Sequence, residues 1–242
     1  MMNIRVMTYN IQHGHVHLSD PGVIDLTKVA AVMKESGADI IGLNEVRGLG
    51  EDEYYTAQAE KIADYLGYHC WFGKSVYVFG FNPYGNAIVS KWPIVKAEVF
   101  PIPSPSDSNT RYYETRSVLR AVIETPEYSQ IAVYCSHFGL TDEEHCNAVS
   151  FVKDMISKES LPFVLMGDFN MTPDDPLIGA LDHSFVSTHH ILEKAGEKTF
   201  PSEAPDELID YIYTSNDFDV GSISTIKIIA SDHRPVLANL TL

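Results

Sequence analysis

Acidic and amide side chains stand together at the end of an apolar run in "FVLMGDFNMTP". Alternation along a strand places Asp168 and Asn170 on one face. A carboxylate there can accept a proton from water while the amide orients that water or binds a phosphoryl oxygen. The alternative interpretation is a turn in which Asp and Asn bond to the local backbone, and the turn-like "MTPDDP" follows directly.

Two further segments carry acids where an apolar run would not need them. Glu45 follows "ADIIGL", and a hard cation such as Mg²⁺ binds through one or two such carboxylates. Taken in isolation, Glu45 is better explained as a solvated glutamate at a strand end. Asp210 lies between Ile209 and Tyr211 in "LIDYIYTS", where an unpaired carboxylate is costly.

A partner for Asp210 is found in "SDHRPV" near the end of the chain. A carboxylate behind an imidazole fixes its tautomer and stabilises its protonated form, so His233 is the expected partner. The alternative is that Asp210 only accepts a hydrogen bond from a neighbouring backbone group.

The elements that must position these residues are mostly strands. A helix is expected from about 21 to 36, with Asp20 as its cap, and further helices in "YTAQAEKIADYLG" and "TDEEHCNAVSFVKDMISK". Many strands with few helices indicate two packed sheets covered by helices, with Asn10, Glu45, His137, Asp168 and Asn170 at strand ends. Runs rich in β-branched and aromatic residues predict strands at 3–11, 39–43, 68–72, 75–79, 85–90, 94–100, 117–124, 130–138, 162–169, 208–214, 220–229 and 235–240.

The composition limits the classes of partner. The chain of 242 residues has a formal net charge of −16, and its 17 basic residues are scattered singly. Tight binding to long nucleic acids normally needs clustered Lys and Arg, so the charge disfavours it. A small anionic substrate is compatible, because one metal ion can reverse the local sign of a site.

The cysteines and the lengths of the apolar runs indicate in which cellular compartment the protein is expected. Cys70, Cys135 and Cys146 are odd in number and show no metal-type spacing, so free thiols in a reducing environment are expected. No run approaches membrane-spanning length, and the N-terminus shows no signal-peptide core. We interpret residues 1–242 as one soluble, cytoplasmic domain, in which 101–110 is a long rim loop.

Nine segments in register resemble the endonuclease/exonuclease/phosphatase superfamily, and most of all its compact bacterial metal-dependent hydrolases. The segments span nearly the whole chain: "TYNIQHG", "GADIIGLNEV", "YGNAIVSKWPI", "ETRSVLRA", "YCSHFGL", "GDFNMTPDDP", "TFPS", "LIDYIYTS" and "SDHRPV". The resemblance implies an α/β fold, a four-layer α/β/β/α sandwich of two packed mixed sheets. It also implies a site at one edge of the two sheets.

The resemblance implies a role for each matched position. Glu45 matches the principal metal ligand, with Asn10 around the metal and Asp232 as a second acid near it. The implied cation is Mg²⁺, with Mn²⁺ as a substitute. The residues implied to contact the phosphate are Asn10, Arg116, His137 and Asn170.

The catalytic positions are implied in the same way. Asp168 and Asn170 match an acid and amide beside the attacking water, and His137 matches a histidine that holds phosphoryl oxygens or assists the leaving group. Asp210 and His233 match the aspartate–histidine dyad of the superfamily. Either Asp168 or the dyad acts as the general base.

Two positions depart from the pattern of the superfamily. Many nuclease members carry an acid where this chain has Gln12, and a neutral amide is a poorer ligand for a second metal. The residue before the glutamate is commonly Gln, whereas here it is the shorter Asn44.

The expected activity is hydrolysis of a phosphodiester or phosphomonoester of a small or lipid-derived molecule. The alternatives are a DNA or RNA nuclease of the same fold, which the charge disfavours, and a non-catalytic binding module. The histidines of "HGHVH" (13–17) are expected in a solvated or substrate-facing loop, with a zinc site as the less favoured alternative. Tyr77, Phe79 and Phe81 are expected on one buried strand face, and Tyr84 is a candidate site residue.

Overall fold

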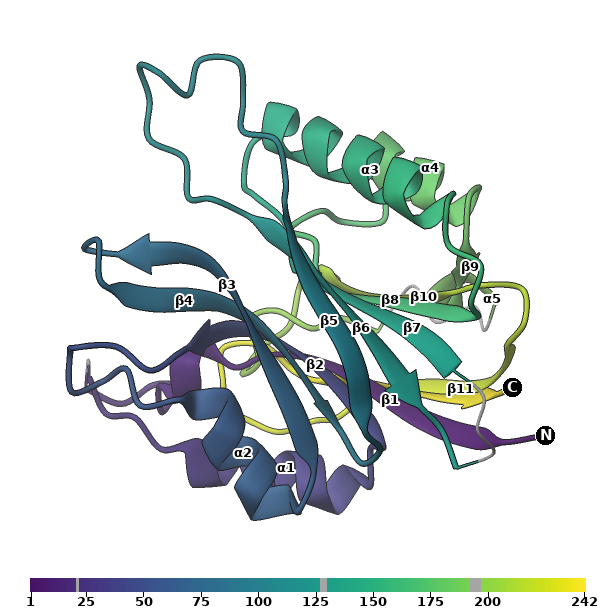
Figure 1. Cartoon of the computed structure of the whole chain (residues 1–242), viewed down its shortest axis with the longest axis horizontal. Helices are drawn as coiled ribbons and strands as arrows, with labels where there is room; N and C mark the ends of the chain where they lie inside the picture. The colour runs from purple at the N-terminus through teal and green to yellow at the C-terminus, as the bar shows by residue number, and fades with distance from the viewer. Residues whose placement is uncertain (21, 127–129, 192–196) are drawn as a thin grey trace.

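The computed structural model describes residues 1–242 except 21, 127–129 and 192–196. Two six-stranded sheets pack face to face, and helices lie against their outer faces (Figure 1). The expected four-layer α/β/β/α sandwich is therefore confirmed.

The first sheet has the strand order β11-β12-β1-β2-β4-β3. β1 and β2 are parallel, and every other neighbouring pair in this sheet is antiparallel. The bounds are β1 (Asn3–Asn10), β2 (Ile40–Arg47), β3 (His69–Val78), β4 (Asn82–Ser90), β11 (Asp219–Thr225) and β12 (Val236–Thr241).

The second sheet repeats this arrangement with the order β5-β6-β7-β8-β10-β9. Here β7 and β8 form the parallel pair among antiparallel neighbours. The bounds are β5 (Ile94–Pro101), β6 (Ser117–Glu124), β7 (Gln130–His137), β8 (Phe163–Asp168), β9 (Val186–Ser187) and β10 (Asp210–Thr214).

Strand direction explains why polar residues gather at one edge of the sandwich. The carboxyl ends of parallel neighbours lie at the same edge, so β1, β2, β7 and β8 finish close together. The antiparallel neighbours β10 and β12 begin at that edge, as the pairing of Asp210 with Asp168 shows. The ends of four strands and the starts of two others therefore bring their polar residues together.

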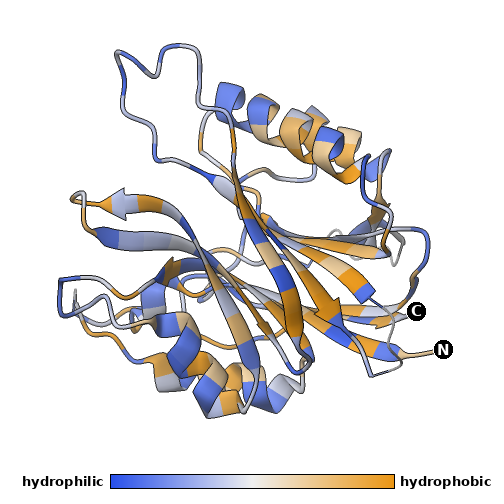
Figure 2. Cartoon of the chain, viewed as in Figure 1, coloured by the Kyte–Doolittle hydropathy of each residue, from blue (hydrophilic) through white to orange (hydrophobic). Residues whose placement is uncertain are grey.

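The core between the sheets is built from alternating apolar residues. Val6 and Ile40 of the first sheet pack with Val133 and Met166 of the second. A side chain at Gly42 would meet the Met166 sulfur, so the glycine permits close approach of the sheets. Figure 2 shows the apolar strands running through the centre of the sandwich.

Helices cover each sheet on one side. α1 (Leu26–Ser36) and α2 (Gln58–Leu66) pack on the first sheet, and α3 (Asp142–Ile156) and α4 (Pro176–Asp182) pack on the second. The short helices are η1 (Gln12–Gly14) and α5 (Thr188–Ile191). None of the helices in the described ranges is long and apolar enough to cross a membrane.

The start of the first helix was predicted too early. α1 begins at Leu26, where the Asp25 side chain accepts a hydrogen bond from the Thr27 amide. Ile24, two residues before the helix, forms an isolated β-bridge with His15 and is therefore not helical. The predicted position 21 lies outside the described residues. The third helix begins as expected, with Thr141 forming a capping box.

The expected burial of three aromatic residues was wrong. The predicted strands 68–72 and 75–79 form one strand, β3, which with β4 makes a hairpin that extends beyond the second sheet (Figure 1). Tyr77, Phe79 and Phe81 lie near its tip and are 51%, 84% and 46% exposed. Gly73, nearer the middle of β3, still faces Val99 and Leu119 of the second sheet. The alternation of apolar residues along β3 therefore continues beyond the point where the second sheet covers this strand.

The remaining predictions about loops and cysteines agree with the structure. The segment between Pro101 and Ser117 forms no helix or strand, as expected of a rim loop. Cys70, Cys135 and Cys146 are all free.

We expect Gly167→Ala to destabilise the protein by about 3 kcal/mol or more. Gly167 has a φ of +150°, and a β-carbon there would overlap the backbone carbonyl oxygen of Ser136 on the neighbouring strand. Gly179→Ala is the control, because nothing lies near its β-carbon and alanine favours its helix. Urea unfolding of both variants measures the difference, and equal stabilities would contradict the steric argument.

Candidate active site

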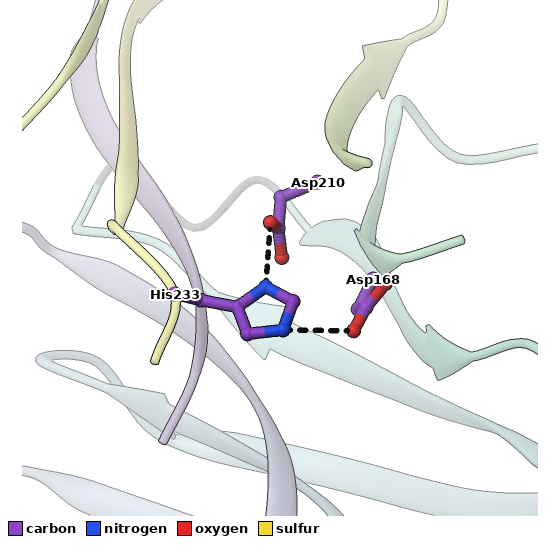
Figure 3. A group of neighbouring side chains, drawn as sticks. All are labelled: Asp168, Asp210 and His233. Carbon is purple, nitrogen blue, oxygen red and sulfur yellow. Dashed lines mark hydrogen bonds and ion pairs between the residues drawn. The ribbon is translucent and has the colours of Figure 1, made fainter. Parts of the chain in front are cut away.

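Asp168, Asp210 and His233 form a buried cluster where the two sheets meet (Figure 3). His233 Nδ1 lies 2.9 Å from Asp210 Oδ2, and His233 Nε2 lies 3.6 Å from Asp168 Oδ2. Each of the three residues is at most 4% exposed. The imidazole thus lies between two carboxylates, and its Asp210 side matches the predicted dyad.

The local structure around the cluster follows from strand register and packing. Asp210 opens β10 directly opposite Asp168, the last residue of β8. His233 lies three residues before β12 begins, and its ring contacts that of Phe200 with centroids 4.8 Å apart. The three side chains therefore come from three different segments, held by two strand edges and one aromatic contact.

The electrostatics of the cluster favour a shared proton. Burial alone would lower the pKa of His233, but the carboxylates of Asp210 and Asp168 outweigh it and raise the pKa. Burial raises the pKa of Asp168, while the nearby imidazole acts in the opposite direction. An imidazolium between two acids is the protonation state that these shifts favour.

Asn10 connects this cluster to Glu45. The Asn10 Nδ2 donates to Glu45 Oε1 at 3.1 Å and to Asp168 Oδ2 at 3.0 Å. Glu45 lies within β2 at a register shift and has a φ of +59°, a left-handed backbone that non-glycine residues rarely adopt. The Tyr84 hydroxyl donates to the other oxygen, Glu45 Oε2, at 2.9 Å. Both carboxylate oxygens of Glu45 therefore have a fixed direction.

Asp232 adds a second negative charge near Glu45. Burial raises the pKa of Glu45, and the charge of Asp232 raises it further. Among the residues that the structure describes, neither acid is ion-paired with a lysine or arginine. A divalent cation would offset both charges, so these residues fit the metal that the resemblance implies.

A second group has the donor spacing of a metal site. One ligand atom each of Asp168, Asp210 and His233 lies within 4.8 Å of the others. The His233–Asp210 hydrogen bond already occupies Nδ1 of the imidazole. The arrangement of this group therefore suits proton transfer as well as metal binding.

The expected phosphate-contacting residues flank Asp168. His137 ends β7 beside it, with Nε2 3.4 Å from Asp168 Oδ2, and burial lowers the pKa of His137 well below its usual range. The strand alternation expected for Asp168 and Asn170 was wrong, because β8 ends at Asp168 and Asn170 has a left-handed φ of +52°. The Asn170 backbone amide donates to Asp168 Oδ1, as in the alternative turn, and its Nδ2 donates to the Phe138 carbonyl. Arg116 forms an ion pair with Glu114 at 2.9 Å, and its charge further lowers the pKa of His137. All predicted site residues thus gather at one edge.

A buried amide network supports the site and was missed from the sequence. Asn44 Oδ1 accepts a hydrogen bond from the Asp168 amide, and its Nδ2 donates to Asn86 Oδ1 at 2.8 Å. Asn86 in turn donates to the Ser117 carbonyl. Asn44, which stands where the superfamily commonly has Gln, therefore bonds to Asn86 and to the backbone of Asp168. Polar residues inside the apolar runs "GLNEV" and "GNAIV" were the available signal.

The histidines of residues 13–17 do not converge on one another. His17 pairs with Glu203 at 2.8 Å, and His15 bonds to Gln12. Within the described ranges, no group with metal-ligand spacing includes these histidines. His13 alone approaches the site, with Nδ1 3.9 Å from Glu45 Oε2.

Two stacked mixed sheets with a carboxylate and imidazole cluster at one edge define the class of fold: an α/β sandwich with a polar site at the sheet edge. The profile of the endonuclease/exonuclease/phosphatase family matches residues 7–233. The chain belongs to this family, whose members are hydrolases of phosphoester or nucleic-acid bonds.

Solved structures show the same fold. An endonuclease/exonuclease/phosphatase from Beutenbergia cavernae is 26% identical, with a TM-score of 0.78 over 99% of this chain and 72% of that chain. A mannosyl-6-phosphatase from Bacteroides thetaiotaomicron is 17% identical, with a TM-score of 0.80 over 99% and 100%. ANGEL2, a 2′,3′-cyclic phosphatase, is 16% identical, with a TM-score of 0.74 over 98% and 95%. No curated protein sequence matches the chain.

Proposed function

We propose that the protein is a metal-dependent phosphoesterase that hydrolyses a small or lipid-derived phosphoester by in-line attack of water. The observation that carries the proposal is the buried Asp168–His233–Asp210 cluster, joined through Asn10 to Glu45. The gathering of three carboxylates and an imidazole at one edge of the sandwich supports this proposal.

The cation would be held by Glu45 and Asp232, with Asn10 beside them. We propose Mg²⁺, with Mn²⁺ as a substitute, because the donors are oxygen atoms. When bound, such an ion stabilises the negative charge that develops on phosphoryl oxygens. Asn10 keeps Glu45 oriented through its hydrogen bond to Oε1.

We assign the two proton transfers of the reaction to different groups, His233 and Asp168. Its raised pKa favours the imidazolium, which can donate a hydrogen bond to a phosphoryl oxygen or a proton to the leaving group. Asp168, whose pKa is raised by burial, is the group that we assign to accept a proton from water, and we assign Asn170, two residues on, to orient that water. Asp210 holds the imidazole in place.

The charge of the protein supports a small substrate. A net charge of −16 disfavours tight binding to nucleic acid, and His137 and Arg116 offer contacts for one phosphate group. The names of two structural neighbours, a mannosyl-6-phosphatase and a 2′,3′-cyclic phosphatase, support small phosphoesters. The free thiols are compatible with the proposed cytoplasmic location.

A panel of substrates assayed with Mg²⁺ and with Mn²⁺ tests the proposal. The panel sets a sugar phosphate, a nucleotide monoester, an aryl diester, a phospholipid headgroup, supercoiled plasmid and an abasic oligonucleotide side by side. We expect metal-dependent turnover of one of the small phosphoesters or the headgroup, abolished by a chelator. Rapid plasmid nicking at physiological salt would favour the nuclease instead, and no turnover of any substrate would favour a binding module.

A further inference from the structure

His13 presents an unused ring nitrogen to the candidate metal ligand Glu45. His13 Nδ1 is buried and has no hydrogen-bond partner in the part of the chain that the structure describes. It lies 3.9 Å from Glu45 Oε2. This distance is too long for a hydrogen bond, so the nitrogen and the oxygen face each other without a direct contact.

The position of His13 is held by specific contacts. Its backbone lies in the left-handed region, with φ +46° and ψ 29°. The fully buried Gln58 donates through Nε2 to the His13 carbonyl at 2.6 Å, and its Oε1 accepts from the Arg47 amide at 2.9 Å. One side chain therefore fixes both the loop that carries His13 and the strand that carries Glu45. Strained backbone of this kind persists only where the surroundings over-determine it.

The environment of His13 keeps a nitrogen lone pair available. Burial, followed by the charges of Arg47 and His15, lowers the pKa of His13 to about 4. An imidazole nitrogen without a bound donor is a common metal ligand, and His13 Nδ1 has no hydrogen-bond partner among the described residues. By contrast, His15, His17 and His233 each have a side-chain hydrogen-bond partner.

We propose that His13 Nδ1 is a ligand of the same cation that Glu45 binds, and that this nitrogen ligand raises the affinity of the site for a transition metal such as Mn²⁺ above the affinity for the Mg²⁺ that the oxygen ligands alone would favour. The inference rests on the metal site of the proposed function. Metal bonds to nitrogen and oxygen are about 2.1 Å long, so two adjacent ligand atoms lie about 3–3.5 Å apart. A movement of less than about 1 Å brings Nδ1 and Oε2 to that separation. Imidazole nitrogen suits transition metals, whereas Mg²⁺ takes oxygen ligands and water.

Mn²⁺ binding to the whole protein tests this inference without an activity assay. Pulsed electron paramagnetic resonance of the Mn²⁺ complex is expected to show a directly bound nitrogen that disappears in His13→Ala and remains in His15→Ala. Calorimetry should show at least about tenfold weaker Mn²⁺ binding in His13→Ala and a change in Mg²⁺ affinity of less than about threefold. His13→Asn, which supplies an oxygen at a similar reach, should restore binding without the nitrogen signal.

The contrary outcomes separate this inference from the proposed function. Tight Mn²⁺ binding that depends on Glu45 but shows no nitrogen signal would overturn the role of His13 and leave the metal site intact. A nitrogen signal that survives in His13→Ala and disappears in His233→Ala would place the ion at the Asp168, Asp210 and His233 group and also overturn the inference. Absence of any Mn²⁺ binding to the native protein would overturn both proposals. Circular dichroism of each variant checks that it folds.

Discussion

Replacing His233 with alanine is expected to lower kcat for phosphoester hydrolysis by about 10³-fold, within the range of general acid–base catalysis. The imidazole lies between both acids of the cluster, with 2.9 Å to Asp210 and 3.6 Å to Asp168. Its removal takes away the proton donor and leaves two buried carboxylates without the positive charge between them. Steady-state kinetics on the substrate found in the panel measure the loss.

The dependence on leaving group distinguishes the roles of His233. If the imidazolium protonates the leaving oxygen, the loss in His233→Ala shrinks with a 4-nitrophenyl ester, because nitrophenolate leaves without a proton. Asp210→Asn is the matched control, since it keeps the imidazole but removes the carboxylate that raises its pKa. We expect it to show the same leaving-group dependence with a smaller loss. A parent rate in His233→Ala with every ester would exclude its catalytic role.

Replacing Asp168 with asparagine is expected to reduce kcat by about 10³-fold with both good and poor leaving groups. The carboxylate accepts hydrogen bonds from the Asn10 side chain and from the Asn170 amide, and it lies 3.4 Å from His137 Nε2. An amide in its place cannot accept a proton from water. It also places a donor where several other donors already converge.

The variant Asp168→Asn separates activation of water from metal binding. We expect its Mn²⁺ affinity to stay within a few-fold of the parent protein, whereas Glu45→Gln should lose Mn²⁺ binding. Its thermal unfolding should show whether the packing of β8 survives. Parent-like turnover in Asp168→Asn would identify the dyad as the base, and equal loss of metal binding in both variants would make Asp168 a ligand.

Much of the architecture was predictable because strand formation depends largely on the residue types within each segment. Runs of β-branched and aromatic residues indicated nearly every long strand, and polar residues at their ends indicated the site edge. Two of the wrong predictions, the start of the first helix and the burial of the hairpin aromatics, occurred where the local sequence pattern fits more than one structure. Asp20 was the expected cap of the first helix, whereas Asp25 caps it in the structure, one residue after the bridge between Ile24 and His15. The aromatic alternation at Tyr77 and Phe79 predicts an apolar face but not whether anything covers it.

The residues of the candidate site could be predicted from the sequence, but most of the hydrogen bonds between them could not. Asp210 needed a partner, and the expected His233 lies 2.9 Å away. The bond from Asn10 to Asp168 joins residues 158 positions apart and depends on how the two sheets stack. The orientation of Glu45 depends on a register shift and a left-handed backbone, neither of which its residue type reveals.

The sequence by itself determined the family, the strands and the chemical groups available for catalysis, because these follow from residue types and their local periodicity. Only the tertiary structure decided which of these groups meet. Strand order and register bring the ends of β1, β2, β7 and β8 to one edge. Gln58, a residue without any motif, sets the distance between His13 and Glu45 by bonding to both segments. Such contacts depend on the packing of distant segments, which no local pattern encodes.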